Sequence, residues 1–231
     1  MKAVIFSDIH GNQYAFRQFL NALDELEYDA LIFCGDIYGY YYGQGKIISG
    51  MQTLEPLLAV RGNHDEMAIR LMEQQGEPTS EFLTKYGHSY CMMKKCDIDY
   101  VRRLPEKIEL MWDGKRILVV HGIPEDPLWG RIYPSDAIAK PEEYIGYDYV
   151  ICGHTHFKMF RKEGHTVILN PGSLGQQRDG KGFGYAWIDF ETGAYRFLNI
   201  QFDISELEKE IDRFDYGNLK LKEILHRGSI S

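Results

Sequence analysis

The chain has 231 residues, 44% hydrophobic and 26% charged, which suits a folded domain rather than a disordered segment. Its formal net charge of -8 at pH 7 lacks the basic surplus that proteins binding long nucleic acid usually carry. No apolar run approaches the roughly 20 residues that cross a bilayer, and the first residues lack the pattern of a signal peptide. We therefore expect a cytoplasmic protein that binds neither membranes nor long nucleic acid.

The four cysteines argue against a zinc ribbon or a thioredoxin-like site, because none of them forms a C-x-x-C pair. Cys34 and Cys152 each end an apolar run, which predicts small buried residues at the ends of strands. This cysteine usage fits the reducing environment of the cytoplasm.

The first third of the chain alternates short apolar runs with helical patterns, as α/β folds with buried parallel strands do. Apolar runs of strand length occupy residues 2–6, 30–34 and 57–60. Asn12 stands where it can cap a helix whose apolar residues recur at spacings of three and four. A weaker helix is expected over 46–54.

The middle of the chain is predicted to be first helical and then β-structure. Residues 65–104 are rich in helix formers, and Asp97 is expected to cap their last short helix. Asp113–Gly114 is a strong signal for a two-residue hairpin, because apolar runs flank it on both sides. Further strands are expected over 149–152, 159–161, 166–169, 185–190 and 195–202.

The C-terminal segment, from about residue 204, is charged and amphipathic. The residues spaced to form one apolar face of a helix are Leu207, Ile211 and Phe214. No repeat, low-complexity tract or linker divides the sequence. We therefore predict a single domain over residues 1–231, with a helical insertion at about 65–104 and this helical tail.

Polar side chains directly follow five of the predicted strands. The five segments are Asp8–Ile9–His10, Gly35–Asp36, Gly62–Asn63–His64–Asp65, His121–Gly122 and Gly153–His154–Thr155–His156. Proteins of the α/β class place their sites at the C-terminal ends of buried strands. Each segment alone is a common loop, but together they hold five of the eight histidines. His154 and His156 can also face one site, because alternate residues of an extended chain project to the same side.

Together the segments resemble the calcineurin-like metallophosphoesterase superfamily, whose ordered pattern is D-x-H, G-D, G-N-H-[DE], H and G-H-x-H. All five blocks occur in that order between Asp8 and His156, over about two thirds of the chain. The stretches G-D-I-Y-G-Y from Gly35 and N-P-G-S-L-G from Asn170 are similar to those of small prokaryotic phosphodiesterase-like members. The resemblance implies an α/β fold: a four-layer α-β-β-α sandwich with two mixed β-sheets and a site on the loops at one edge.

The resemblance also implies two divalent metal ions, with Asp36 bridging them and His64 beside them as the catalytic side chain. One ion would be held by Asp8, His10 and His156, and the other by Asn63, His121 and His154. Oxygen and imidazole ligands without thiolate favour Mn²⁺, with iron, zinc, nickel or cobalt as alternatives. Two ions about 3.5–4 Å apart can clamp a phosphate and activate a bridging hydroxide. Two divalent ions, two aspartates and that hydroxide sum to about +1, which attracts a phosphodiester anion.

Several neighbours of these ligands are candidates for supporting roles. His64 is expected to protonate the leaving oxygen as an imidazolium, since its intrinsic pKa lies near neutrality. Asp65 is expected to anchor its loop. Tyr40, Arg61 and Arg178 are candidates for substrate binding, and each arginine has a structural role as its alternative. The tyrosines of residues 38–42 suggest a wall on which a nucleobase stacks; the alternative is that two or more of them pack into the core.

The expected activity is hydrolysis of a small or nucleotide-containing phosphodiester by the bridging hydroxide. A phosphomonoesterase or a dinucleoside polyphosphate hydrolase of the same fold is an alternative. Gly39 and Tyr40 count against the symmetric dinucleoside tetraphosphate hydrolases and the Ser/Thr protein phosphatases, which carry an Asp or a nearby Arg there. A catalytically idle protein-binding scaffold is the alternative of another class, although such relatives usually lose a ligand or the catalytic histidine. The sequence leaves the natural substrate and the oligomeric state open.

Overall fold

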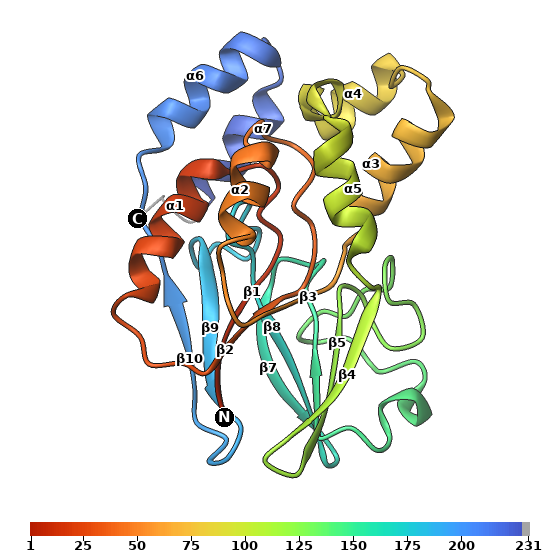
Figure 1. Cartoon of the computed structure of the whole chain (residues 1–231), viewed down its shortest axis with the longest axis vertical. Coiled ribbons are helices and arrows are strands. Elements are labelled where there is room, and N and C mark those ends of the chain that lie inside the picture. The colour runs from red at the N-terminus through yellow and green to blue at the C-terminus, as the bar shows by residue number, and fades with distance from the viewer. Residues whose placement is uncertain (228–231) are drawn as a thin grey trace.

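Two mixed β-sheets form the centre of the molecule, and the computed structural model describes residues 1–227 (Figure 1). The first sheet has the order β10-β9-β1-β2-β3, with β1 Lys2–Phe6, β2 Ala30–Phe33, β3 Leu57–Ala59, β9 Gly184–Asp189 and β10 Tyr195–Asn199. The second has the order β4-β5-β6-β8-β7, with β4 Lys107–Trp112, β5 Lys115–Val120, β6 Tyr149–Ile151, β7 Lys158–Glu163 and β8 Thr166–Pro171. Each sheet combines a run of parallel strands, β1-β2-β3 or β5-β6-β8, with antiparallel neighbours. The predicted α/β class with two mixed sheets is confirmed.

The helices gather mainly at one end of the molecule (Figure 1). They are α1 Gln13–Leu23, α2 Gln44–Met51, α3 Asn63–Gln74, α4 Ser80–Tyr86, α5 Lys95–Arg103, α6 Ile204–Phe214 and α7 Leu219–Glu223. Short 3₁₀ turns are η1 His88–Met92, η2 Pro141–Tyr144 and η3 Ile224–His226. The insertion helices α3–α5 and the C-terminal helices α6 and α7 lie at the same end, opposite the N-terminus (Figure 1). Among residues 1–227, no helix is both long and apolar enough to cross a membrane.

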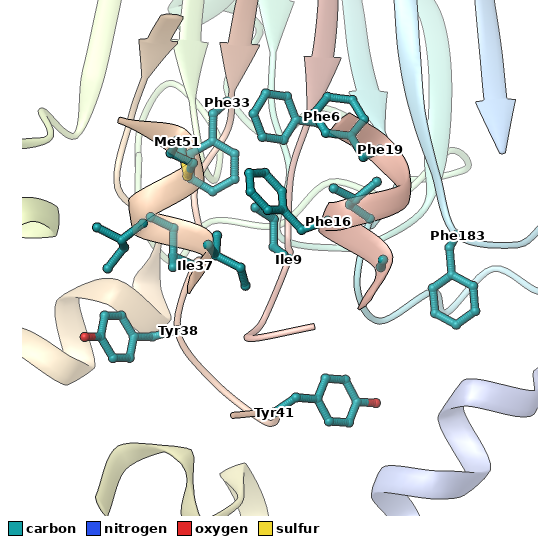
Figure 2. Packing of buried hydrophobic residues seen from close by; sticks show 14 of the residues in the cluster. Phe6, Ile9, Phe16, Phe19, Phe33, Ile37, Tyr38, Tyr41, Met51 and Phe183 are labelled. Carbon is teal, nitrogen blue, oxygen red and sulfur yellow. The ribbon is translucent and has the colours of Figure 1, made fainter. Parts of the chain in front are cut away.

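Strand β1 is buried on both faces, which explains its uninterrupted apolar sequence. Its alternate residues serve two different cores, because successive side chains point to opposite faces of a sheet. Ile5 packs between the two sheets in one cluster with Val119. Phe6 packs on the helical side, where its ring lies 4.6 Å from that of Phe19 (Figure 2).

The outer face of the second sheet is covered by the segment between β5 and β6. Ile132 and Tyr144 of this segment pack against Val120 and Val150 of the sheet. Its regular structure is the short 3₁₀ turn η2, so this outermost layer is thin and mostly irregular. The layer against the first sheet, by contrast, is built of helices.

Local signals for helix and hairpin formation are confirmed, with one correction. Asn12 caps α1, since its Oδ1 accepts a hydrogen bond from the backbone N–H of Ala15 at 3.0 Å. The hairpin at Asp113–Gly114 joins β4 to β5. Asp97, however, lies inside the first turn of α5, and Lys94 is the N-cap. An acidic side chain is favourable at the cap and in the first turn alike, so its residue type could not separate the two positions.

The insertion and the tail share the helical-side core with the first sheet. Tyr90, Ile98 and Val101 of the insertion are buried in the same cluster as Leu207 and Ile211 of the tail. Phe214, the third residue of the predicted apolar face, is half-buried. One continuous cluster therefore joins the three parts of the chain. The last four residues of the predicted domain, 228–231, lie outside the described residues.

Candidate metal centre

All seven predicted ligands follow the C-terminal ends of strands, six of them on loops and Asn63 at the first residue of α3. From the first sheet come Asp8, His10, Asp36 and Asn63, and from the second come His121, His154 and His156. The strands before them run parallel within each sheet, so their loops meet at one edge. A hydrogen bond from His121 Nδ1 to the Cys34 carbonyl oxygen, 2.7 Å long, links the loops of the two sheets.

Asp8, His10 and His156 bring three acceptor atoms together. His156 Nε2 lies 3.1 Å from His10 Nε2 and 3.2 Å from Asp8 Oδ1. The far nitrogen of each ring faces a carbonyl oxygen: His10 Nδ1 faces that of Tyr38 at 2.8 Å, and His156 Nδ1 faces that of Gln176 at 2.5 Å. A carbonyl only accepts, so each neutral ring places its proton there and turns a lone pair inward. Asp8 Oδ1 is buried with no hydrogen-bond partner among the described residues. A cation would satisfy all three atoms.

Asn63, His121 and His154 form a second group with Asp36. His121 Nε2 lies 2.9 Å from Asn63 Oδ1 and 3.1 Å from His154 Nδ1. It also lies 3.2 Å from Asp36 Oδ2. The donors are again carboxylate, amide and imidazole, with no thiolate, which suits a transition-metal ion.

Asp36 lies between the two groups. Its Oδ2 is 3.2 Å from His121 Nε2 in the second group and 3.7 Å from His10 Nε2 in the first. Burial disfavours a charge on this carboxyl, but the neighbouring His121 holds the pKa of Asp36 below its usual range. A charged carboxylate shared by both groups is what a bridging ligand requires.

The histidines differ in protonation. Burial lowers the pKa of His154 to about 3 and that of His156 to about 4, so both rings are neutral at pH 7 and able to bind a cation. Burial also opposes a charge on His121, but Asp36 beside it overrides burial and raises the pKa of His121 to about 9. A metal ion and a proton therefore compete for Nε2 of His121.

Five of the seven predicted ligands have a left-handed backbone, which non-glycine residues seldom adopt. Their φ angles are 54° for Asp8, 50° for His10, 68° for Asp36, 66° for His154 and 63° for His156. Such conformations cluster at functional sites, because the surrounding structure must hold them in place. Gly62 is closely packed against one of these ligands. A Cβ at this position would lie 2.1 Å from Asp36 Oδ1, so only glycine fits without a shift of its neighbours.

Asp65 holds these loops in place, as the sequence predicted. It is fully buried, and its carboxylate accepts hydrogen bonds from four backbone N–H groups. The donors are Asp36, Ile37, Tyr38 and Gly62, all at 2.9–3.0 Å. One side chain thus joins the loop that follows β2 to the loop that follows β3.

His64 stands beside the two ligand groups. Its backbone N–H donates to Asp36 Oδ1 at 2.8 Å, and its ring centroid lies 4.9 Å from that of His10. Its Nδ1 is 2.6 Å from the hydroxyl of Tyr90 in η1, a contact with no local signal in the sequence. Burial lowers the pKa of His64 well below its ordinary value, so the imidazolium expected from its intrinsic pKa is disfavoured in this structure. His64 is therefore a neutral ring that Tyr90 orients.

The three candidates for substrate binding lie in different surroundings. Tyr40 is at the centre, with its ring 4.8 Å from that of His10 and 5.0 Å from that of His64. The Tyr40 hydroxyl accepts a hydrogen bond from Arg178 at 3.1 Å. Arg61 instead binds Glu106, Glu66 and the Leu104 carbonyl oxygen, which are the contacts of a structural arginine.

The predicted wall of tyrosines is wrong for three of its four members. Tyr38 and Tyr41 are buried in the core (Figure 2). Tyr42 donates a hydrogen bond to Asp215 at 2.6 Å and packs against Phe214 of α6. The loop has no regular period, so the sequence could not show which rings point inward. Tyr40 alone is left beside the ligands.

Arg131 is a further neighbour of the centre, and the sequence did not point to it. It comes from the segment that covers the second sheet, and its Nε donates to His154 Nε2 at 3.0 Å. A single arginine in an irregular loop carries no signal of its own. Only the fold brings it to a ligand.

Comparisons with known proteins agree with this geometry. A family model described as the calcineurin-like phosphoesterase superfamily domain matches residues 1–193. An uncharacterized protein of Methanocaldococcus jannaschii is 25% identical over 230 residues, covering 90% of each chain. A phosphodiesterase of the same organism is 23% identical over 173 residues, covering 74% of this chain and 83% of its own. The solved structure of a metallophosphoesterase from Sphaerobacter thermophilus is 24% identical, has a TM-score of 0.81 and covers 99% of each chain. Since the family model spans every predicted ligand, the chain belongs to the calcineurin-like phosphoesterase superfamily.

Proposed function

We propose that the chain is a phosphoesterase that uses two divalent metal ions to hydrolyse a small phosphodiester. The observation that carries the proposal is the convergence of Asp8, His10 and His156, whose inward-facing atoms have no proton to share. A second group of nitrogen and oxygen donors adjoins it through Asp36. The family implies divalent metal ions, and these residues fit them.

The two groups would each hold one ion. The ligands would be Asp8, His10 and His156 for the first ion, Asn63, His121 and His154 for the second, and Asp36 for both. When bound, the ions would bind the phosphate and lower the pKa of the attacking water. We favour Mn²⁺, since the donors are oxygen and imidazole nitrogen, with iron, zinc, nickel and cobalt as alternatives.

His64 is proposed to assist departure of the leaving group. Its Nδ1 accepts a hydrogen bond from the Tyr90 hydroxyl, so the neutral ring carries its proton on Nε2. From there the Nε2–H would donate a hydrogen bond to the leaving oxygen and stabilise the negative charge that develops on it. Asp65 contributes indirectly, because it holds the backbone around Asp36 and His64.

A diester substrate is favoured because a relative of the chain is named a phosphodiesterase. A phosphomonoester and a dinucleoside polyphosphate remain the alternatives within the same chemistry. An idle protein-binding scaffold is the alternative of another class, and it would bind metal without hydrolysing any ester. The protein is proposed to act in the cytoplasm.

Metal content and activity test the proposal together. Purified protein should contain two transition-metal ions per chain, lose activity to a chelator and recover it best with manganese, nickel or cobalt. Asp36→Ala should abolish activity and reduce metal content, because it removes a ligand from both ions. Asp24→Asn, on the exposed end of α1, is the control and should change neither. Near wild-type activity and metal content in Asp36→Ala would refute the assignment.

A chromogenic diester and monoester measured side by side then decide the substrate class. We expect the higher kcat/KM for the diester. A kcat/KM about a hundredfold higher for the monoester under matched conditions would overturn this preference. Hydrolysis of neither ester by metal-loaded protein would favour the scaffold.

Tyr40 makes a nucleotide-containing diester testable. Its ring can stack on a base, and stacking is worth about 1–3 kcal/mol per base. Tyr40→Ala should therefore lose roughly ten- to hundredfold in kcat/KM on a nucleotide diester, while a base-free diester is hydrolysed as before. Tyr40→Phe keeps the ring and should behave like the wild type. Equal losses of Tyr40→Ala on both esters would remove the support for a nucleotide.

A further inference from the structure

Arg131 is fixed at the rim of the second ligand group by the segment in which it lies. The next residue, Ile132, is buried against the outer face of the second sheet. On the other side, the backbone N–H of Gly130 donates to the Asp126 carbonyl oxygen at 3.1 Å. The backbone on both sides is therefore held, and the Arg131 side chain reaches from it to His154.

The guanidinium of Arg131 has no counter-charge among the described residues, although it lies beside a ligand group. Within residues 1–227, no carboxylate lies within 4.0 Å of it, whereas Arg61 pairs with both Glu66 and Glu106. Its one side-chain hydrogen bond among the described residues is the bond from Nε to His154 Nε2. A guanidinium has five N–H donors in a planar fork that matches phosphate oxygens. Most of this capacity is therefore available.

The hydrogen bond from Arg131 requires that His154 Nε2 carry no proton. His154 Nδ1 faces His121 Nε2 at 3.1 Å, and this side belongs to the second ligand group. A neutral ring whose Nδ1 binds a cation carries its proton on Nε2, where it would face the N–H of Arg131. The Arg131 hydrogen bond cannot survive that change, and the guanidinium is released beside the second ion.

We propose that Arg131 is a substrate-binding residue whose released guanidinium binds a non-bridging oxygen of the phosphate beside the second ligand group. The inference rests on the proposed function, since it assumes that His154 Nδ1 holds an ion. It also gives the centre a cation at each side. Arg178 reaches Tyr40 next to His10 in the first group, and Arg131 reaches His154 in the second. The negative charge of a phosphate group between them would be met from both directions.

Binding of inorganic phosphate to the metal-loaded protein tests this without relying on turnover. By calorimetry, Arg131→Gln should bind phosphate about ten- to hundredfold more weakly, the loss expected for hydrogen bonds to a charged group. Arg131→Lys should fall between, because a lysine supplies the charge without the fork. The matched control is Arg17→Gln, since Arg17 is an exposed arginine on α1 with no salt bridge among the described residues, and it should bind phosphate as the wild type does.

Metal affinity separates this role from a structural one. The Arg131–His154 bond is lost when the ion binds, so Arg131→Gln should keep two ions and bind the second at least as tightly as the wild type. A weaker second ion would mean that Arg131 braces His154, and would overturn the proposal. Unchanged phosphate binding in Arg131→Gln, or no phosphate binding by the wild type, would overturn it as well. Phosphate binding that depends on Arg131 in a protein that hydrolyses no ester would refute the proposed function alone.

Discussion

His64 and Tyr90 show how a residue far along the chain orients a proposed catalytic side chain. The 2.6 Å contact between the Tyr90 hydroxyl and His64 Nδ1 fixes the ring, and both residues are buried. His64 is recognisable from the sequence, because it follows Asn63 in a motif block. Tyr90 is not, because it lies 26 positions further along the chain in a different helical segment, and no periodicity links the two residues. Motif residues can thus be predicted, while the residues that orient them depend on tertiary structure.

Replacement of His64 tests its role in stabilising the leaving oxygen. His64→Ala should keep both ions and lower kcat by about 10²–10³, as loss of a hydrogen-bond donor to a developing oxyanion does. The loss should shrink for esters with very good leaving groups, which are stable as anions without that hydrogen bond. An equal loss for good and poor leaving groups would indicate positioning instead.

Replacement of Tyr90 tests the orientation of His64. Tyr90→Phe removes one hydrogen bond, worth about 0.5–1.5 kcal/mol, and should lower kcat roughly two- to twelvefold with KM unchanged. Like that of His64→Ala, the loss should be greatest for poor leaving groups. The control is Tyr86→Phe, since the Tyr86 ring also packs on His64 but its hydroxyl does not bind it. A uniform loss for all leaving groups would argue that Tyr90 only supports the fold.

At the scale of elements, the strands and most helices follow from periodicity, whereas the irregular loops do not. Residues 2–6 match β1 in full, and the hairpin at Asp113–Gly114 was readable because its turn residues are specific. The last strand was predicted over 195–202 but ends at Asn199. Whether each tyrosine after Asp36 is buried depends on contacts with the insertion and the tail, which lie far along the chain. Asp215, which follows α6, joins these parts by accepting hydrogen bonds from Tyr42 and His88.

Asp215→Asn is expected to loosen this junction. Asparagine places an NH₂ group where one carboxylate oxygen now accepts, so at least one of the three hydrogen bonds is lost at a cost of about 1–3 kcal/mol. For a chain of this length the melting temperature should fall by about 2–12 °C. Asp212→Asn is a suitable comparison, because Asp212 is exposed and paired only with Lys222, and its loss should cost about 1 kcal/mol or less. Equal melting temperatures for Asp215→Asn and wild type would mean that the junction contributes nothing.

For the whole molecule, the candidate metal centre joins the two sheets. Asp8, Asp36 and His10 come from loops of the first sheet, whereas His121 and His156 come from loops of the second. Ions bound at this edge would contact ligands from both sheets only in the folded state. The ligands are far apart along the sequence, from Asp8 to His156, and unfolding would separate them. Ion binding and folding stability are therefore expected to be coupled.

Calorimetry with and without a chelator measures this coupling. Each ion should stabilise the protein by about 2.7 kcal/mol at a free concentration one hundred times its dissociation constant. Manganese should therefore raise the melting temperature, and a chelator should reverse the rise. Asp36→Ala should respond much less to either treatment. A wild-type melting temperature that is the same in manganese and in chelator would contradict a shared site between the sheets.

The left-handed backbone of the ligand loops has an evolutionary consequence. At Asp8, His10, Asp36, His154 and His156, the conformation itself costs stability, and it would cost more with any β-branched side chain. Glycine would relieve the strain at each position but would remove a predicted ligand. Selection for a more robust fold and selection for a metal centre therefore act in opposite directions at the same five codons. In a lineage that no longer needs catalysis, we expect substitution by glycine at these positions first. Such substitutions would raise the folding stability while they remove metal-binding side chains.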